Sequence, residues 1–78
     1  MNENKLEIRN LAIATFLYAS KVDLVGTVKR DGSIYFQFFP KDKADSLVKD
    51  YFSGKARVNP RELFARYNDL KDLIFKEK

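Results

Sequence analysis

The chain has neither cysteine nor histidine among its 78 residues. Without cysteine it has no disulfide framework, no thiolate nucleophile and no zinc–thiolate site. Without histidine it lacks the commonest general base and the commonest ligand of transition metals. Its three glycines form no glycine-rich phosphate loop, and its scattered carboxylates have no spacing that marks a Mg²⁺ site. We therefore expect a protein that is not an enzyme and that uses no cofactor and no metal.

The chain also has no apolar run close to the roughly 20 residues that cross a bilayer, and its charged amino terminus is unlike a signal peptide. These absences predict no membrane contact and a cytoplasmic location. Hydrophobic residues nevertheless make up 45% of the chain and aromatic residues 14%, which argues against disorder. We expect one small domain, 1–78, in which residues 1–5 fray.

A β-hairpin is predicted around Asp31-Gly32, because two runs of strand-type residues flank this pair. Asp-Gly between apolar runs is typical of a tight turn, often one with a two-residue loop. Such a loop would place Val28 beside Tyr35 and would split the apolar side chains between the two faces of the ribbon. Burial of one face therefore favours a different register.

A three-residue loop, 30–32, pairs Val28 with Ile34 and gathers the apolar side chains on one face. In this register Gly26 lies opposite Phe36 and leaves room for its ring. We predict this register, with a buried face of six residues: Val22, Leu24, Val28, Ile34, Phe36 and Phe38.

Three other segments have helical patterns. The segment 11–20 is apolar almost all round, which predicts a central buried helix capped by Asn10. A buried strand is the competing interpretation of so short a run, but its alanines favour a helix. The second helix is predicted to start at Asp42, close to a capping box, and to end before Gly54. Its apolar face is formed by Ala44, Leu47, Val48, Tyr51 and Phe52.

The third helix, predicted from Pro60 to about residue 76, has the clearest start signal. Asn59 is its cap, Glu62 completes a capping box, and Val58 can pack on Leu63 as a hydrophobic staple. Its apolar stripe is formed by Leu63, Tyr67, Leu70 and Ile74, widened by Phe64 and Leu73. The alternating residues 6–8 could add a short strand, and the sequence leaves this open. The order (β)αββαα predicts an α+β fold in which three helices pack on a hairpin or a three-stranded sheet.

The other face of the hairpin is the first candidate site. In the predicted register it carries a partner-binding group, Val25, Tyr35, Gln37 and Phe39, beside Asp23, Thr27 and Lys29. Clustered apolar side chains outside a core indicate a contact surface. The occupant could be a protein partner, a second copy in a homodimer, the chain's own amino-terminal segment or stacked bases. We predict a non-catalytic interaction module that binds another protein or itself.

A basic patch is the second candidate site, because 15 Lys and Arg oppose 11 Asp and Glu and give a net charge of +4. The possible anion or nucleic-acid patch consists of Lys29, Arg30, Lys55, Arg57, Arg61 and Arg66. Free N–H groups at the start of the third helix favour an anion near these cations. Solvated charges partly paired with Glu62 and Asp50 are the alternative explanation. The patch predicts an alternative function as a nucleic-acid-binding accessory protein, although the connection 53–58 is too long for a helix-turn-helix.

Four short segments are distinctive: ATFL at 14–17, YFQF at 35–38, YFSGKARV at 51–58 with Arg61, and LKDL at 70–73. Together they resemble a small bacterial and phage domain family of unknown function, over about residues 10 to 75. The resemblance implies a short α+β protein from a bacterial or phage genome. It assigns no catalytic or binding residues.

Overall fold

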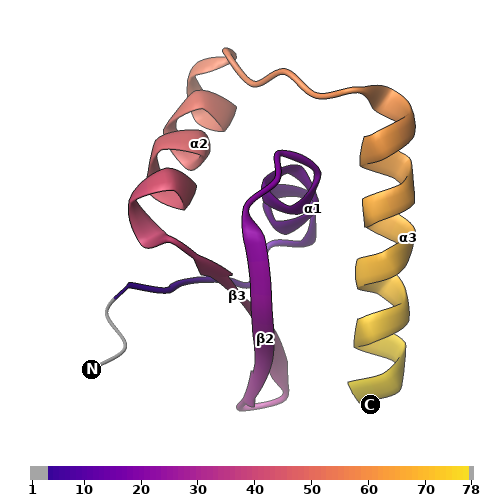
Figure 1. Cartoon of the computed structure of the whole chain (residues 1–78). Helices are drawn as coiled ribbons and strands as arrows, with labels where there is room; N and C mark the ends of the chain where they lie inside the picture. Colours follow the sequence, from indigo (N-terminus) through magenta and orange to yellow (C-terminus); the bar gives the residue numbers. More distant parts are fainter. Residues whose placement is uncertain (1–3, 78) are drawn as a thin grey trace.

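The computed structural model describes residues 4–77 (Figure 1). Its elements follow in the order β1 (Leu6–Ile8), α1 (Leu11–Ala19), β2 (Asp23–Arg30), β3 (Ser33–Phe39), α2 (Lys41–Ser53) and α3 (Pro60–Glu77). The three strands form an antiparallel sheet in the order β1-β3-β2. This confirms the predicted α+β fold and shows that residues 6–8 are a strand.

Part of the segment expected to fray, residues 1–3, lies outside the described residues. Within the described part, the backbone N–H of Lys41 donates to the carbonyl of Asn4 at 2.6 Å. The approach to β1 is therefore tied to the start of α2.

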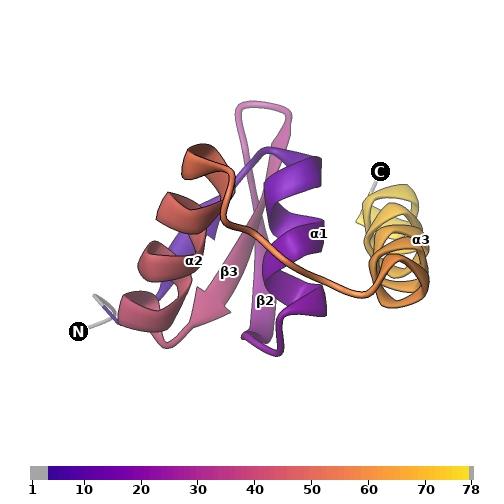
Figure 2. The ribbon, with the colours of Figure 1, turned by 90° about the horizontal axis from the view of Figure 1, so that it is seen from above.

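Helix α1 lies between α2 and α3 in both ribbon views, and the loop 54–59 passes over it (Figures 1 and 2). Its side chains are buried along nearly its whole length, as an apolar helix requires. The side-chain Oδ1 of Asn10 accepts from the N–H of Ile13 at 3.0 Å, which confirms the predicted cap. The hydroxyl of Thr15, a buried polar residue, donates to the carbonyl of Leu11 at 2.7 Å.

The hairpin turn differs from the predicted register. Val28 pairs with Tyr35 and not with Ile34, so the loop has two residues, Asp31 and Gly32. Both have positive φ angles, 51° and 80°, as a type I′ turn requires. The prediction of a three-residue loop was therefore wrong, and the hairpin has the tight two-residue turn that is typical of Asp-Gly.

A β-bulge in β2 reconciles this turn with one buried face. The register shifts between Leu24 and Gly26, so Val25 is the extra residue. Gly26 therefore lies opposite Gln37, and its predicted position opposite Phe36 was wrong. The predicted register assumed a regular ladder, whereas one inserted residue allows both the two-residue turn and the packing of half-buried Leu24 on the helix side.

The bulge also changes which side chains of β2 face the helices. Thr27 pairs with Phe36 and shares its side of the sheet, as does Lys29 two residues later. Val28 pairs with Tyr35 and lies on the outer face. The predictions that Val28 belongs to the buried face, and that Thr27 and Lys29 belong to the other, were wrong for this reason.

The rest of the predicted buried face lies on the helix side, with Leu24 and Ile34 half-buried against the core. Phe36 and Phe38 are 1% and 0% exposed and pack in one cluster with Leu17 of α1 and Leu70 of α3. Val22, just before β2, is buried in the same cluster. Helices α1 and α2 lie over this face of the sheet, and α3 packs beside α1 (Figure 2).

Helix α2 begins one residue earlier than predicted. Pro40 is its N-cap and makes no side-chain cap hydrogen bond, so the capping box expected at Asp42 was wrong. The extended backbone of Pro40 directly precedes Lys41, whose Nζ lies 2.9 Å from Oδ2 of Asp45 one turn on. The helix ends, as predicted, before Gly54, which is its C-cap, has a φ of 80° and donates its N–H to the carbonyl of Asp50.

Candidate functional site

The outer face of the sheet carries the predicted partner-binding residues. Tyr35, Gln37 and Phe39 alternate along β3 and so share that face, and Val25 lies in the bulge of the neighbouring strand. Val25 is 47% exposed and Phe39 41%, whereas Tyr35 and Gln37 are half-buried. The fold thus brings Tyr35, Gln37 and Phe39 onto the outer face, while Val25, at the edge strand, lines a hollow with Glu62 and Arg66 of α3.

A polar network occupies the middle of this outer face. The carboxylate of Glu7 in β1 accepts two hydrogen bonds from Arg30, at 2.5 and 3.0 Å, and one from Nε2 of Gln37 at 2.9 Å. These hydrogen bonds, with Arg30 the larger cause, lower the pKa of Glu7 to about 2. The guanidinium of Arg30 also lies 5.4 Å from the ring centroid of Tyr35. Gln37 and Tyr35 therefore already have partners within the chain.

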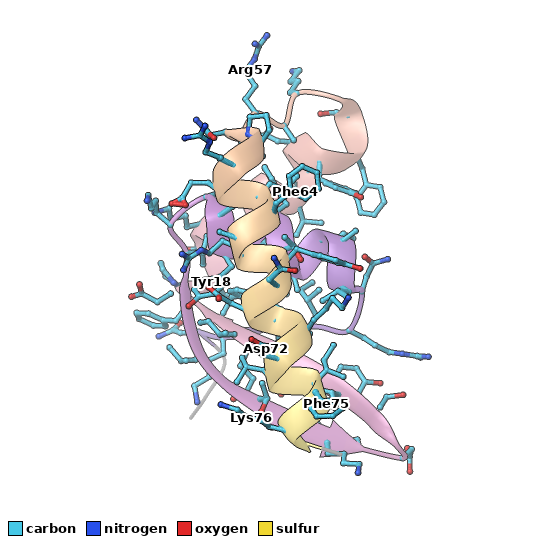
Figure 3. The ribbon with its side chains drawn as sticks, turned by 90° about the vertical axis from the view of Figure 1, so that its right-hand side faces the viewer. Tyr18, Arg57, Phe64, Asp72, Phe75 and Lys76 are labelled. Atoms are coloured by element: carbon cyan, nitrogen blue, oxygen red, sulfur yellow. The ribbon has the colours of Figure 1, made fainter. Side chains whose placement is uncertain are left out.

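The predicted basic patch is divided between two ends of the molecule. Lys55 and Arg57 lie in the loop between α2 and α3, and Arg61 lies in the first turn of α3. Figure 3 shows Arg57 at this end of the molecule. Lys29 and Arg30 lie beside the hairpin turn, at the opposite end (Figure 1). The first three cations are exposed, and none of them forms an ion pair with any residue in the range 4–77.

The sixth patch residue, Arg66, has contacts of its own. Its guanidinium lies 5.1 Å from the ring centroid of Tyr18, and Nη1 lies 3.2 Å from Oδ2 of Asp69. It lines a hollow of about 630 Å³ between α3 and the start of β2, together with Lys21, Asp23 and Glu62. Two cations and two carboxylates oppose each other there, so the hollow favours no class of charged ligand.

An apolar groove between the three helices is a further candidate site, and we name it the three-helix groove. It has a volume of about 330 Å³ and is lined by Ala12, Thr15, Phe16, Tyr51, Ala56, Val58, Leu63, Phe64 and Tyr67. Helix α1 contributes its floor, while α2, the following loop and α3 contribute its walls. None of the lining side chains is charged, so the groove suits apolar groups of a ligand.

Local structure at the start of α3 positions one end of the groove. The side-chain Oδ1 of Asn59 accepts from the N–H of Arg61 at 2.8 Å and of Glu62 at 3.3 Å, which confirms the predicted cap. Val58 and Leu63, predicted to form a hydrophobic staple across this cap, both line the groove. The cap thus fixes the angle at which the loop enters α3.

Aromatic rings extend from the floor of the groove to its surface. The ring of buried Phe16 lies 5.9 Å from that of Tyr51, which meets Phe52 edge-on at 5.4 Å. Phe52, beside the groove, is 72% exposed, and Phe64, on the wall formed by α3, is 66% exposed. On α3, Tyr67 is 38% exposed. Three exposed aromatic side chains, Tyr51, Phe64 and Tyr67, thus line the groove, and the exposed ring of Phe52 contacts one of them.

The helical spacing in the sequence places these aromatic residues on the apolar faces of α2 and α3 but does not predict the groove. The helical spacing identifies an apolar face correctly, yet it does not say whether another element covers that face. Here α2 and α3 lie on opposite sides of α1 and leave its exposed residue Ala12 between them (Figure 2). The one sequence feature that points to the groove is the concentration of aromatic residues at the outer edge of the apolar stripes of α2 and α3.

Comparison of the chain with protein-family models, with curated proteins and with solved structures finds no match. The resemblance to a bacterial and phage family therefore stays an expectation. In the part of the chain that the structure describes, no helix has the length and apolar character needed to cross a bilayer. The same part has no group of three or more acidic, histidine or cysteine residues arranged to hold a metal ion.

Proposed function

We propose that this chain is a non-catalytic interaction module that binds another protein through the three-helix groove. The observation that carries the proposal is the row of exposed aromatic side chains along an uncharged groove. Aromatic residues are enriched at the centres of protein interfaces, and clustered apolar exposure on a small domain is typical of a binding site.

The outer face of the sheet, predicted from the sequence, is the competing surface for the same function. Its exposed apolar residue Phe39 shares this face with the network of Glu7, Arg30 and Gln37. A partner on that face must cover or break this charged network, and desolvating it costs free energy. A partner in the groove meets no charge on the lining. We therefore favour the groove.

Panning a library of displayed peptides against the immobilised protein tests the proposal. We expect enrichment on the wild-type chain and at least about tenfold weaker binding of the enriched peptides to Phe64→Ser, since about 1.4 kcal/mol of lost contact gives this factor. The matched control is Phe75→Ser, the same substitution at a 79% exposed residue of α3 outside the groove lining, and it should retain binding.

A third variant, Phe39→Ser, separates the two surfaces. Peptides that lose affinity for Phe39→Ser and keep it for Phe64→Ser would place the binding site on the outer face of the sheet and overturn the groove. The absence of enrichment on the wild-type chain would overturn the interaction module itself.

Nucleic-acid binding is a second candidate function, favoured by three exposed cations that form no ion pair with residues 4–77: Lys55, Arg57 and Arg61. It predicts an electrophoretic shift of a DNA or RNA oligonucleotide at low salt that weakens steeply as salt is added. Replacing the three cations by Ala should abolish the shift. No shift of either nucleic acid at about 50 mM salt would exclude this function, because the electrostatic contribution is large there.

A further inference from the structure

We infer that the occupant of the three-helix groove is an amphipathic helix of a partner protein with carboxylates beside its apolar face. This inference rests on the proposed function and names the chemistry of the partner. It follows from the charges around the groove, from the shape of the groove and from the occupants that these features disfavour.

The first observation is the alternation of the loop between α2 and α3. Ala56 and Val58 line the groove, while their neighbours Lys55 and Arg57 are exposed. The two cations therefore lie on the outer side of the loop, next in the chain to residues of the groove lining, and Arg57 projects at this end of the molecule (Figure 3). Since neither forms an ion pair within residues 4–77, both can meet the charge of a ligand.

The second observation is a cation on the wall formed by α3. Nζ of Lys71 lies 5.4 Å from the ring centroid of Tyr67, which lines the groove. Lys71 is one turn of helix further along α3 than Tyr67, so it stands beyond the groove on that wall. Cations at the loop and at this wall, with an uncharged lining between them, are complementary to carboxylates that flank an apolar ligand surface.

The third observation is the shape. Three helices form the floor and walls, and the small side chain of Ala12 leaves the floor open to side chains that enter from outside. An apolar trough between helices is the usual receptor for an amphipathic helix, which inserts residues at i, i+3 or i+4, and i+7. Such a helix presents its remaining positions to the rim, where the carboxylates would meet the cations.

Two other occupants fit less well. A second copy of this chain would bring equal basic rims together, and each chain already has a net charge of +4. A nucleic acid could use the same cations, but the floor offers base edges only Thr15, whose hydroxyl already donates to Leu11. The apolar floor and the basic rim together favour an acidic peptide.

Fluorescence anisotropy with a designed peptide pair tests the inference. The acidic probe is a labelled helical peptide of about 16 residues, long enough to form several turns, with Leu and Phe at i, i+4 and i+7 and Glu on the flanking positions. Its matched partner has Lys in place of each Glu. We expect the acidic peptide to bind at least about tenfold more tightly, with an affinity that falls as salt screens the charges.

Charge reversal at the rim supplies the decisive variant. Lys55→Glu with Arg57→Glu should reverse the preference, so that the basic peptide binds better than the acidic one. The control, Lys49→Glu with Lys76→Glu, makes the same change in net charge at exposed residues outside the groove and should leave the preference intact. Circular dichroism of each variant checks that the fold is retained.

The outcomes separate this inference from the proposed function. Equal binding of both peptides, sensitive to Phe64→Ser, would overturn the acidic partner and leave the interaction module standing. No binding of either peptide would overturn the inference, and a failed panning experiment would then remove the proposed function as well. Two further results would overturn the inference. The first is that an oligonucleotide displaces the acidic peptide while unlabelled peptide does not. The second is that the wild-type chain forms a dimer that Phe64→Ser dissociates.

Discussion

At the scale of single residues, the surroundings of a side chain decide its contribution, and two phenylalanines illustrate the range. Phe36 is 1% exposed between the sheet and α1, whereas Phe75 on α3 is 79% exposed. Phe36→Ala should lower the free energy of unfolding by about 3–5 kcal/mol, because it leaves a cavity in the only large cluster of the described residues. Phe75→Ala should change it by less than about 0.5 kcal/mol. Urea denaturation checks both, and similar losses would contradict the assignment of the core.

The carboxylate of Glu7 gives the chain an acid-sensitive contact. Its pKa in the folded chain is about 2, below the ordinary value of 4.5, because Arg30 and Gln37 donate to its charged form. A lowered pKa contributes stability above the ordinary value, and this stability is lost as the pH falls from about 5 towards 2. Glu7→Gln should therefore lose less stability than the wild-type chain over this range.

Denaturant titrations at several pH values measure this difference. The control is Asp72→Asn, which removes one exposed carboxylate of α3 and should follow the wild-type profile. Parallel profiles for Glu7→Gln and the wild-type chain would show that the network on the outer face contributes nothing to acid sensitivity.

At the scale of elements, the turn and the bulge of the hairpin depend on each other. Gly32 has a φ of 80°, and a Cβ placed there meets no atom within 4 Å. The free-energy cost of a side chain at this position is therefore purely conformational. Gly32→Ala should lower the free energy of unfolding by about 1–2 kcal/mol, because an L side chain is strained in this region. Asp31→Asn, at a φ of 51°, should be close to neutral, since Asn adopts left-handed backbone readily. Equal effects of the two substitutions in thermal melting would contradict the two-residue turn.

Local signals predicted the element boundaries better than they predicted the register. The caps Asn10 and Asn59 and the end of α2 at Gly54 were predicted correctly, because each depends on a few neighbouring residues. The pairing of Val28 was predicted wrongly, because it depends on a bulge elsewhere in β2. The apolar pattern identified the buried face at Phe36, but it could not show that one extra residue would reconcile that face with a tight turn.

At the scale of the whole molecule, the positions of the helices decide which predicted surfaces exist. The six cations predicted as one patch are divided, because the hairpin turn and the loop after α2 lie at opposite ends (Figure 1). Conversely, the three-helix groove combines residues from α1, α2, the loop and α3 that no single sequence pattern connects. Helical periodicity predicted the apolar stripes, and the packing of α2 and α3 on α1 leaves part of each stripe uncovered.

Nuclear magnetic resonance of the ¹⁵N-labelled chain tests most directly whether the groove is the binding surface. The acidic peptide is added in steps, and the amide shifts of the chain are followed residue by residue. We predict the largest changes at the groove, including Ala56 and Val58, and little change at the amides of Tyr35 and Gln37. Changes centred on the outer face of the sheet, with the groove amides unmoved, would contradict the account.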